Sequence, residues 1–212
     1  LRAPIASVRL MAEELEEIGL ADAKKNREYQ RFIVQECRRL SGLIENVLDF
    51  ARHEQGRRQY EFDSTDLEAL LRETARVMQT YADAKEISIR VVVRGEPEPI
   101  EADGRALQQV AVNLLDNAIK HSPPRAEIET GLEYAPQAVE LWVLDHGEGI
   151  PAEEHERIFE RFYRRGTELR RQTQGVGLGL AIVKYVTQAH GGRVGVQRSE
   201  ERRVGKECRS RW

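Results

Sequence analysis

Amide and basic side chains recur at four-residue spacing in the middle of the chain. Gln109, Asn113, Asn117 and His121 follow one another every four residues, with Lys120 beside the last of them. On a helix this spacing stacks the side chains along one face. An amide oxygen can complete the coordination of a magnesium ion that phosphates already hold, and a lysine can meet phosphate charge. Taken alone, such a stripe is more typical of an ordinary solvated helix face.

Two glycine-containing motifs follow farther along the chain. Asp145-His146-Gly147-Glu148-Gly149-Ile150 ends a strand-like run, so its carboxylate can accept a hydrogen bond from an amine while the glycines admit a flat ring. By itself this motif is better explained as an acidic turn. Gly175-Val176-Gly177-Leu178-Gly179-Leu180 opens a helix, where exposed amides and the helix dipole favour phosphate. Its GxGxG spacing after a polar loop argues against a Rossmann dinucleotide fold.

An aromatic cluster and a polar stretch separate these two motifs. Ile158-Phe159-Glu160-Arg161-Phe162-Tyr163-Arg164 leads into residues 165–174. Loops of about a dozen residues are uncommon in compact domains and are often functional lids. We therefore expect residues 165–174 to form a lid. The aromatic residues either anchor the base of this lid or are ordinary core residues, and the sequence supports both interpretations equally.

The N-terminal elements are predicted to be two helices. Apolar residues alternate steps of four and three in two stretches, at Leu1, Ile5, Val8, Ala12 and Leu15 and then at Ile33, Cys37, Leu40, Ile44, Val47 and Ala51. Two antiparallel helices cannot fully bury two such heptad seams. We therefore expect a second hairpin from another chain to complete a four-helix bundle, the alternative being a hairpin packed on the following domain.

After a polar break at residues 56–59, strands and helices mix without regular β-α-β alternation. The pattern predicts a strand near residues 60–62, a helix that a Thr65–Glu68 capping box opens, and a helix that begins at Asp103. Further strands are predicted at 87–93, 126–133 and 138–145, with helices after Pro151 and at 178–190. The predicted fold class is α+β: a helical hairpin, forming a dimeric four-helix bundle, followed by an α/β sandwich with helices on one face of a mixed sheet.

Composition and charge restrict the possible functions. The 33 lysines and arginines are offset by 36 acidic residues, which gives no sign of a nucleic-acid partner. No stretch approaches the ~20 apolar residues needed to cross a bilayer, and no signal peptide is visible. Cys37 and Cys208 lack metal-ligand spacing and suit a reducing compartment. Composition therefore predicts a soluble, cytoplasmic chain.

Together, the order and the amino-acid sequences of these motifs resemble those of the bacterial sensor histidine kinases of two-component systems. The chain has counterparts of the family's N box at 113–122, G1 box at 145–149, F box at 159–163 and G2 box at 175–179. Leu1 to Ile5 resembles the end of the H box, and Leu40 to Arg52 resembles the second dimerisation helix. The resemblance implies a dimerisation and phosphotransfer hairpin at 1–56, truncated at its N-terminus, an ATP-binding catalytic domain at 57–199, and an atypical tail at 200–212 that we suspect is non-native.

The resemblance also implies a site for ATP and magnesium. Asn113 and Asn117 would bind magnesium and phosphate, Asn113 and Lys120 would serve catalysis, and Asp145 would read the adenine amino group. His121 and Leu180 would contact the nucleotide, and the pocket and lid would be shaped by Gly147, Gly149, Gly175, Gly177 and Gly179.

The implied reaction transfers the γ-phosphate to a histidine on the dimer bundle and then to an aspartate on a response-regulator receiver domain. The implied protein is a homodimer through its hairpin, with a cytoplasmic catalytic region and a membrane anchor upstream. The acceptor histidine and its acidic neighbour would stand just before Leu1, outside this sequence. Ala3 replaces the threonine or asparagine that the family associates with dephosphorylation. The tail after Ser199 departs from the family pattern, so we expect an open sheet edge.

Two alternatives from other classes are weighed against this interpretation. Gyrase- and mismatch-repair-type ATPase switches share the implied nucleotide fold, but they resemble one another in carrying a water-activating glutamate where this chain has Asn113. An amide cannot accept a proton near neutral pH, so general-base hydrolysis is disfavoured. The second alternative is a silent nucleotide-binding dimerisation module.

Overall fold

The computed structural model describes residues 2–18, 25–27, 29–34, 37, 40, 59–136, 138–164, 177–198 and 206–211. The chain divides into two compact units, a first unit at Leu1–Gly56 and a second at Arg57–Trp212. Within the described residues, no helix is both long and apolar enough to span a bilayer. Several predicted features lie outside them: the lid at 165–174, and Leu1, Ile44, Val47, Ala51 and Gly175.

The first unit contains helix α1, Arg2–Ile18, and helical residues at 25–27, 29–34, 37 and 40. Both predicted helices are therefore present in the described part of this unit. The predicted seam of α1 keeps apolar surface exposed, because Ile5 is 55% exposed and Val8 and Leu15 are half-buried. A single copy of the hairpin thus leaves part of its heptad seam uncovered.

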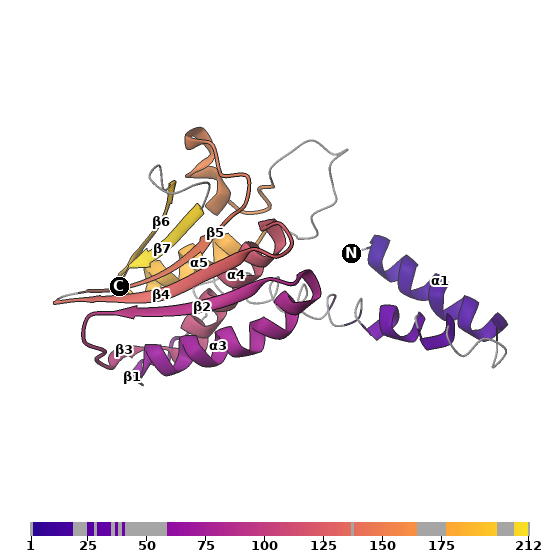
Figure 1. The fold of residues 1–212 in the computed structure, drawn as a ribbon, viewed down its shortest axis with the longest axis horizontal. Coiled ribbons are helices and arrows are strands. Elements are labelled where there is room, and N and C mark those ends of the chain that lie inside the picture. Colours follow the sequence, from indigo (N-terminus) through magenta and orange to yellow (C-terminus); the bar gives the residue numbers. More distant parts are fainter. Residues whose placement is uncertain are drawn as a thin grey trace. The chain divides into compact units, whose positions relative to one another are not determined.

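The second unit is built on a five-stranded mixed sheet (Figure 1). The strand order is β2-β4-β5-β7-β6, with bounds Ser88–Arg94, Glu127–Ala135, Ala138–Asp145, Lys206–Arg211 and Arg193–Arg198. Strands β2 and β4 pair in parallel, and the other neighbours pair antiparallel. A separate antiparallel pair joins β1, Asp63–Thr65, to β3, Ile100–Ala102, a strand that the sequence pattern did not predict.

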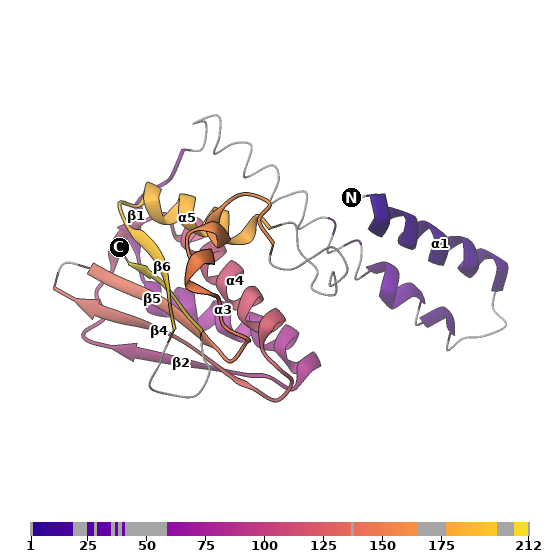
Figure 2. The same ribbon diagram turned by 90° about the horizontal axis from the view of Figure 1, so that it is seen from above.

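Three helices cover one face of this sheet: α3, Leu67–Ala82, α4, Gly104–His121, and α5, Gly179–Ala189 (Figures 1 and 2). Their apolar positions recur every three or four residues and meet the inward-facing residues of β4 and β5 in one core. The core includes Leu71, Leu107, Val110, Leu115, Ile128, Leu132, Leu141, Ile182 and Val186. The predicted two-layer arrangement is confirmed. Three short 3-10 helices, η1 (Asp83–Lys85), η2 (Ala152–Glu154) and η3 (Arg157–Phe159), complete the described elements.

The start of α3 differs from the prediction. Asp66, not Thr65, is the N-cap, since its carboxylate accepts a hydrogen bond of 3.0 Å from the backbone N–H of Ala69. The Thr65 hydroxyl instead donates to the carbonyl of Ala102 at 2.9 Å. Thr65 therefore ties β1 to β3, and the strand predicted near residues 60–62 lies three residues later.

The expectation that the C-terminal tail leaves a sheet edge open is also wrong. Residues 206–211 form β7, which pairs with β5 on one side and with β6 on the other. Ladder hydrogen bonds use backbone groups, so a segment that departs from the family's side-chain pattern can still occupy an interior position in the sheet. That the tail is non-native stays a prediction.

Gly131, at the centre of β4, permits a close approach of neighbouring groups. A Cβ atom at this position would lie 2.2 Å from the Val92 carbonyl oxygen and 2.6 Å from the Trp142 ring. Trp142 is paired with Gly131 across the strands and is 4% exposed. The missing side chain thus makes room for the indole ring on the outer face of the sheet.

We predict that Gly131→Ala lowers the free energy of unfolding of the second unit by about 1–3 kcal/mol, because the added methyl overpacks the sheet. Gly195→Ala in β6 is the matched control, since a Cβ atom there would meet no atom of the described residues within 4 Å. We expect the control to change stability by less than about 0.5 kcal/mol. Urea unfolding curves of both variants check this, and equal losses would contradict it.

Candidate functional site

Helix α4 places the predicted polar stripe at the edge of the core. Asp103 caps the helix by accepting a hydrogen bond of 2.9 Å from the N–H of Ala106. Neighbouring positions on the helix are fully buried, whereas the stripe itself is half-buried at Gln109, Asn113 and Asn117 and exposed at His121. The stripe is therefore neither core nor fully solvated.

Lys85 fixes the C-terminal end of α4. Its ammonium group donates to the carbonyl of Ile119 at 2.7 Å and to that of Lys120 at 3.0 Å. A cation that satisfies terminal carbonyls stabilises the last turn of a helix. No local sequence pattern marks Lys85 for this role, because it lies more than thirty residues upstream of its partners.

The loop after β5 contacts this same end of α4. The N–H of Gly147 donates to Oδ1 of Asp145 at 2.8 Å. A Cβ atom at Gly147 would lie 3.0 Å from the backbone carbonyl oxygen of His121. Gly149 has a φ of +81°, in the left-handed region that glycine adopts readily. These glycines let Asp145 sit beside the last turn of α4.

The start of α5 lies against the middle of α4. A Cβ atom at Gly179 would lie 3.3 Å from Oδ1 of Asn113. Leu178 occupies the N-cap position, and no side chain of the described residues caps the helix there. Leu180, in the first turn of α5, is half-buried. Uncapped N-terminal amides carry partial positive charge, which favours an anion at this end of the helix.

Two buried polar atoms of the 113–122 segment lack a hydrogen-bond partner in the described part of the chain. They are the amide nitrogen of Asn113 and the hydroxyl of Ser122, which is 4% exposed. Buried polar groups in native proteins are nearly always satisfied, so an orphan calls for an explanation, of which a bound group or an ordered water is one. Beside the uncapped start of α5, the Asn113 amide fits a phosphate–metal group, since it offers both a donor and an oxygen ligand.

The aromatic cluster both fills the core and anchors the glycine-rich turn. Ile158 and Phe159 are 7% and 8% exposed, whereas Phe162 is 59% exposed with a φ of +59°. The N–H of Phe162 donates to the carbonyl of Gly177 at 2.9 Å. A left-handed backbone is costly for a bulky residue, and such strain is held by surrounding structure. Gly177, with a φ of +75°, faces this strained residue.

Lys120 already has a partner. Its ammonium group pairs with the carboxylate of Asp116, one turn earlier on α4. The Lys120 side chain is 35% exposed, and an ammonium group has three donors. Lys120 can therefore keep Asp116 while it donates to a phosphate, a pairing that the four-residue spacing could have indicated.

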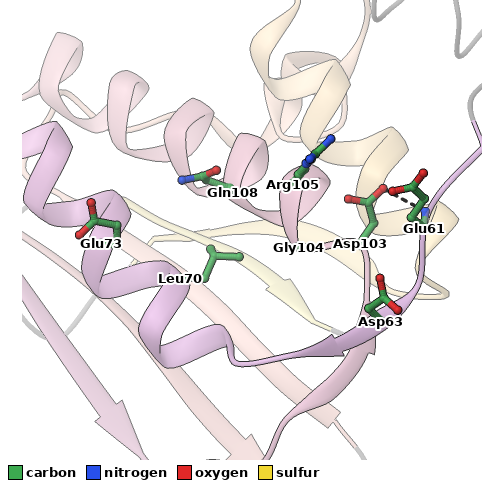
Figure 3. A pocket seen from close by; sticks show the side chains of 8 residues that line it. All are labelled: Glu61, Asp63, Leu70, Glu73, Asp103, Gly104, Arg105 and Gln108. Carbon is green, nitrogen blue, oxygen red and sulfur yellow. Dashed lines mark hydrogen bonds between the residues drawn. The ribbon is translucent and has the colours of Figure 1, made fainter.

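A surface hollow at the N-terminal end of α4 is chemically different from this region (Figure 3). Its lining residues are Glu61, Asp63, Leu70, Glu73, Asp103, Gly104, Arg105 and Gln108, and it contains none of the predicted site residues. A hydrogen bond from Arg76 lowers the pKa of Glu73, which is therefore anionic at neutral pH. Four carboxylates against one arginine disfavour a polyphosphate here.

Comparison with known proteins bears on what the site binds. The sequence model of the histidine kinase-, DNA gyrase B- and HSP90-like ATPases matches residues 102–211, and that of the His Kinase A (phospho-acceptor) domain matches residues 1–56. The fold and the site thus define an ATP-binding domain of this ATPase class. With the phospho-acceptor domain preceding it, the chain belongs to the sensor histidine kinases of two-component systems.

Individual relatives agree with this assignment. The probable sensor histidine kinase TcrY of Mycobacterium tuberculosis is 35% identical over 199 residues, which are 94% of this chain and 41% of TcrY. The structure of full-length ShkA in complex with AMPPNP is 32% identical, with a TM-score of 0.73 over 99% of this chain and 43% of that one. Histidine kinase ThkA, in complex with response regulator TrrA, shares the fold at 23% identity and a TM-score of 0.73, over 99% of this chain and 57% of that one. This chain spans less than half the length of TcrY.

We predict that Gly177→Ala weakens ATP binding at least about tenfold, because its Cβ atom would lie 2.7 Å from the Tyr163 carbonyl oxygen and separate the aromatic cluster from the start of α5. Gly191→Ala is the matched control. Gly191 has nearly the same φ, +74°, but within the described part of the chain no atom lies within 4 Å of its Cβ position. Both variants bear left-handed strain of about 1–2 kcal/mol. A difference between their ATP affinities, measured by calorimetric titration, therefore reports the steric contact at residue 177 and not the backbone strain. Similar affinities for the two would contradict the prediction.

Proposed function

We propose that the second unit binds ATP with magnesium between α4, the β5 loop and the start of α5. The adenine amino group donates to Asp145, and the phosphates meet the amides at Gly177–Gly179. Asn113 and Asn117 would hold magnesium, which would supply positive charge to neutralise the phosphates. The observation that carries this proposal is the buried amide nitrogen of Asn113, which has no hydrogen-bond partner among the described residues, beside Gly179 at the start of α5, where no described side chain caps the helix.

The glycines and polar groups of the site have separate roles in this proposal. Gly147 and Gly149 let the adenine ring approach the backbone. His121 lies beside Gly147, at the rim of the proposed nucleotide site. Lys120 adds positive charge near the phosphates. Leu180 contributes apolar surface in the first turn of α5. Gly175 belongs to the same glycine-rich motif, outside the described residues.

The proposed reaction is transfer of the γ-phosphate to a histidine. The bond between the γ-phosphorus and the bridging oxygen of ADP breaks as a bond to an imidazole nitrogen forms, and the family pattern places that histidine just before Leu1. Positioning and charge neutralisation supply most of the acceleration in such reactions. Asn113 supports a histidine as acceptor in preference to water, because an amide takes no proton from water near neutral pH.

The histidine would then pass its phosphate to an aspartate of a response-regulator receiver domain. The complex of ThkA with the response regulator TrrA supports this class of partner. Because ATP is the phosphoryl donor, we place this catalytic region in the cytoplasm. A membrane anchor in the parent protein stays a prediction.

We also propose that the first unit forms a homodimer through its heptad seam. Ile5 lies on the predicted seam and is 55% exposed in a single copy. A second hairpin would remove this surface from water, at about 25 cal/mol for each Å² of apolar area buried. The resulting four-helix bundle is the arrangement that the two seams require.

We predict that Asp145→Asn weakens ATP binding by roughly ten- to hundredfold, because an amide group can present a donor to the adenine amine and the lost charged hydrogen bond is worth ~1.5–3 kcal/mol. Calorimetric titration with magnesium ATP measures the affinity, and thermal unfolding should show a far smaller effect. Unchanged affinity would remove Asp145 from the adenine site.

We predict that Ile5→Asp converts the chain from dimer to monomer at micromolar concentration, because a charge in the seam would have to be desolvated in the bundle. Leu10→Asp is the matched control, since Leu10 is 52% exposed and lies about 140° from Ile5 around α1, off the seam. Sedimentation equilibrium reports the mass. A dimeric Ile5→Asp variant would place the dimer interface elsewhere.

A further inference from the structure

His190 immediately follows α5 and uses both ring nitrogens. Nε2 accepts a hydrogen bond of 3.0 Å from the backbone N–H of Asp103, and Nδ1 lies 2.8 Å from the carbonyl oxygen of Val186. An N–H can only donate and a carbonyl can only accept, so the ring is neutral with its hydrogen on Nδ1. The Nδ1 bond is local to α5, whereas the Nε2 bond joins the end of α5 to the N-cap of α4.

The segment that leads into β1 meets the same pair of residues. The rings of Tyr60 and Phe62 lie 5.2 Å and 4.9 Å from the imidazole, measured between ring centroids. Between them, the N–H of Glu61 donates to Oδ2 of Asp103 at 3.3 Å (Figure 3). Residues 60–62 thus hold the imidazole on one side and the α4 cap on the other.

Helices α4 and α5 run antiparallel, and two contacts define their relative position along the axis. Asp103 at the start of α4 meets His190 at the end of α5, and Asn113 farther along α4 meets Gly179 at the start of α5. At 1.5 Å per residue, the span is about 15 Å on α4 and about 16 Å on α5. Because a helix is stiff along its axis, a shift of α5 along α4 at one of these contacts also shifts α5 at the other contact.

We infer that His190 is a positioning residue that sets the register of α5 against α4 and thereby holds the Gly177–Gly179 backbone beside Asn113. This inference rests on the proposed ATP site. His190 touches no nucleotide in this assignment, because it lies at the opposite end of α5 from the phosphates. Its effect should therefore be confined to the phosphate half of the ligand, and Asp145 should still read adenine.

Two substitutions of similar polarity separate the two hydrogen bonds of His190. The amide of His190→Gln reaches the position of Nε2 and can still accept from Asp103. The shorter amide of His190→Asn reaches the position of Nδ1 and keeps only the bond to Val186. We expect His190→Asn to weaken magnesium ATP binding about tenfold, given the cost of losing the partner of a part-buried N–H. We expect His190→Gln to stay within about threefold of the unaltered chain.

Adenosine is the probe that distinguishes positioning from loss of fold. The affinities of the full 212-residue chain and its variants for magnesium ATP and for adenosine are measured by NMR titration, with thermal unfolding in parallel. In His190→Asn, ATP affinity should fall while adenosine affinity is unchanged. Gly131→Ala is the destabilised control, and it should lower the unfolding temperature without changing the ratio of the two affinities.

Phe62→Ala tests the position of His190 through its contact with the segment at residues 60–62. Phe62 is 47% exposed, so the fold should tolerate its loss. We expect a two- to threefold loss of ATP affinity with adenosine unchanged. Equal losses for both ligands, or equal behaviour of the Gln and Asn variants, would overturn the inference. No ATP binding by the unaltered chain would instead refute the proposed function, and with it this role of His190.

Discussion

The contact between α4 and α5 is the interaction on which the proposed nucleotide site depends. Gly179 can approach the Asn113 amide because it has no side chain, and the first amides of α5 are then directed to the same place as the polar stripe of α4. Neither helix would suffice alone. An uncapped helix start attracts anions weakly, and an isolated asparagine stripe is a common solvated surface.

Both ends of α4 are stabilised, the first by its own N-cap residue and the last by a residue far away in the sequence. Asp103 caps the first turn, and Lys85 satisfies the carbonyls of the last. The buried face of the helix packs between the sheet and its neighbouring helices. This rigidity matters for phosphoryl transfer, in which misplacement of a reacting group by about 1 Å can cost a hundredfold in rate.

Charge is distributed unevenly along α4. The N-terminal end faces the carboxylates of Glu61, Asp63 and Glu73, whereas the C-terminal half carries Lys120 and approaches the amides of α5. A triphosphate is therefore repelled from one end of the helix and attracted to the other. The acidic end is instead the place where residues 60–62, the α4 cap and His190 meet.

Much of this protein follows from its sequence by itself. The four-residue spacing on α4, its Asp103 cap, the heptad seams and the order of the glycine motifs are local patterns, and local patterns specify helices and their polar faces. Tertiary structure alone decided which segments meet: Lys85 with the end of α4, Gly147 with His121, and His190 with Asp103. It also decided that Asp66 caps α3 and that residues 206–211 lie between β5 and β6. Some of these contacts join residues tens of positions apart, and the α3 cap depends on which of two adjacent residues accepts the hydrogen bond. The periodicity of the sequence predicts neither the long-range contacts nor the choice of capping residue. Packing of the whole unit determines which backbone groups still need a hydrogen-bond partner.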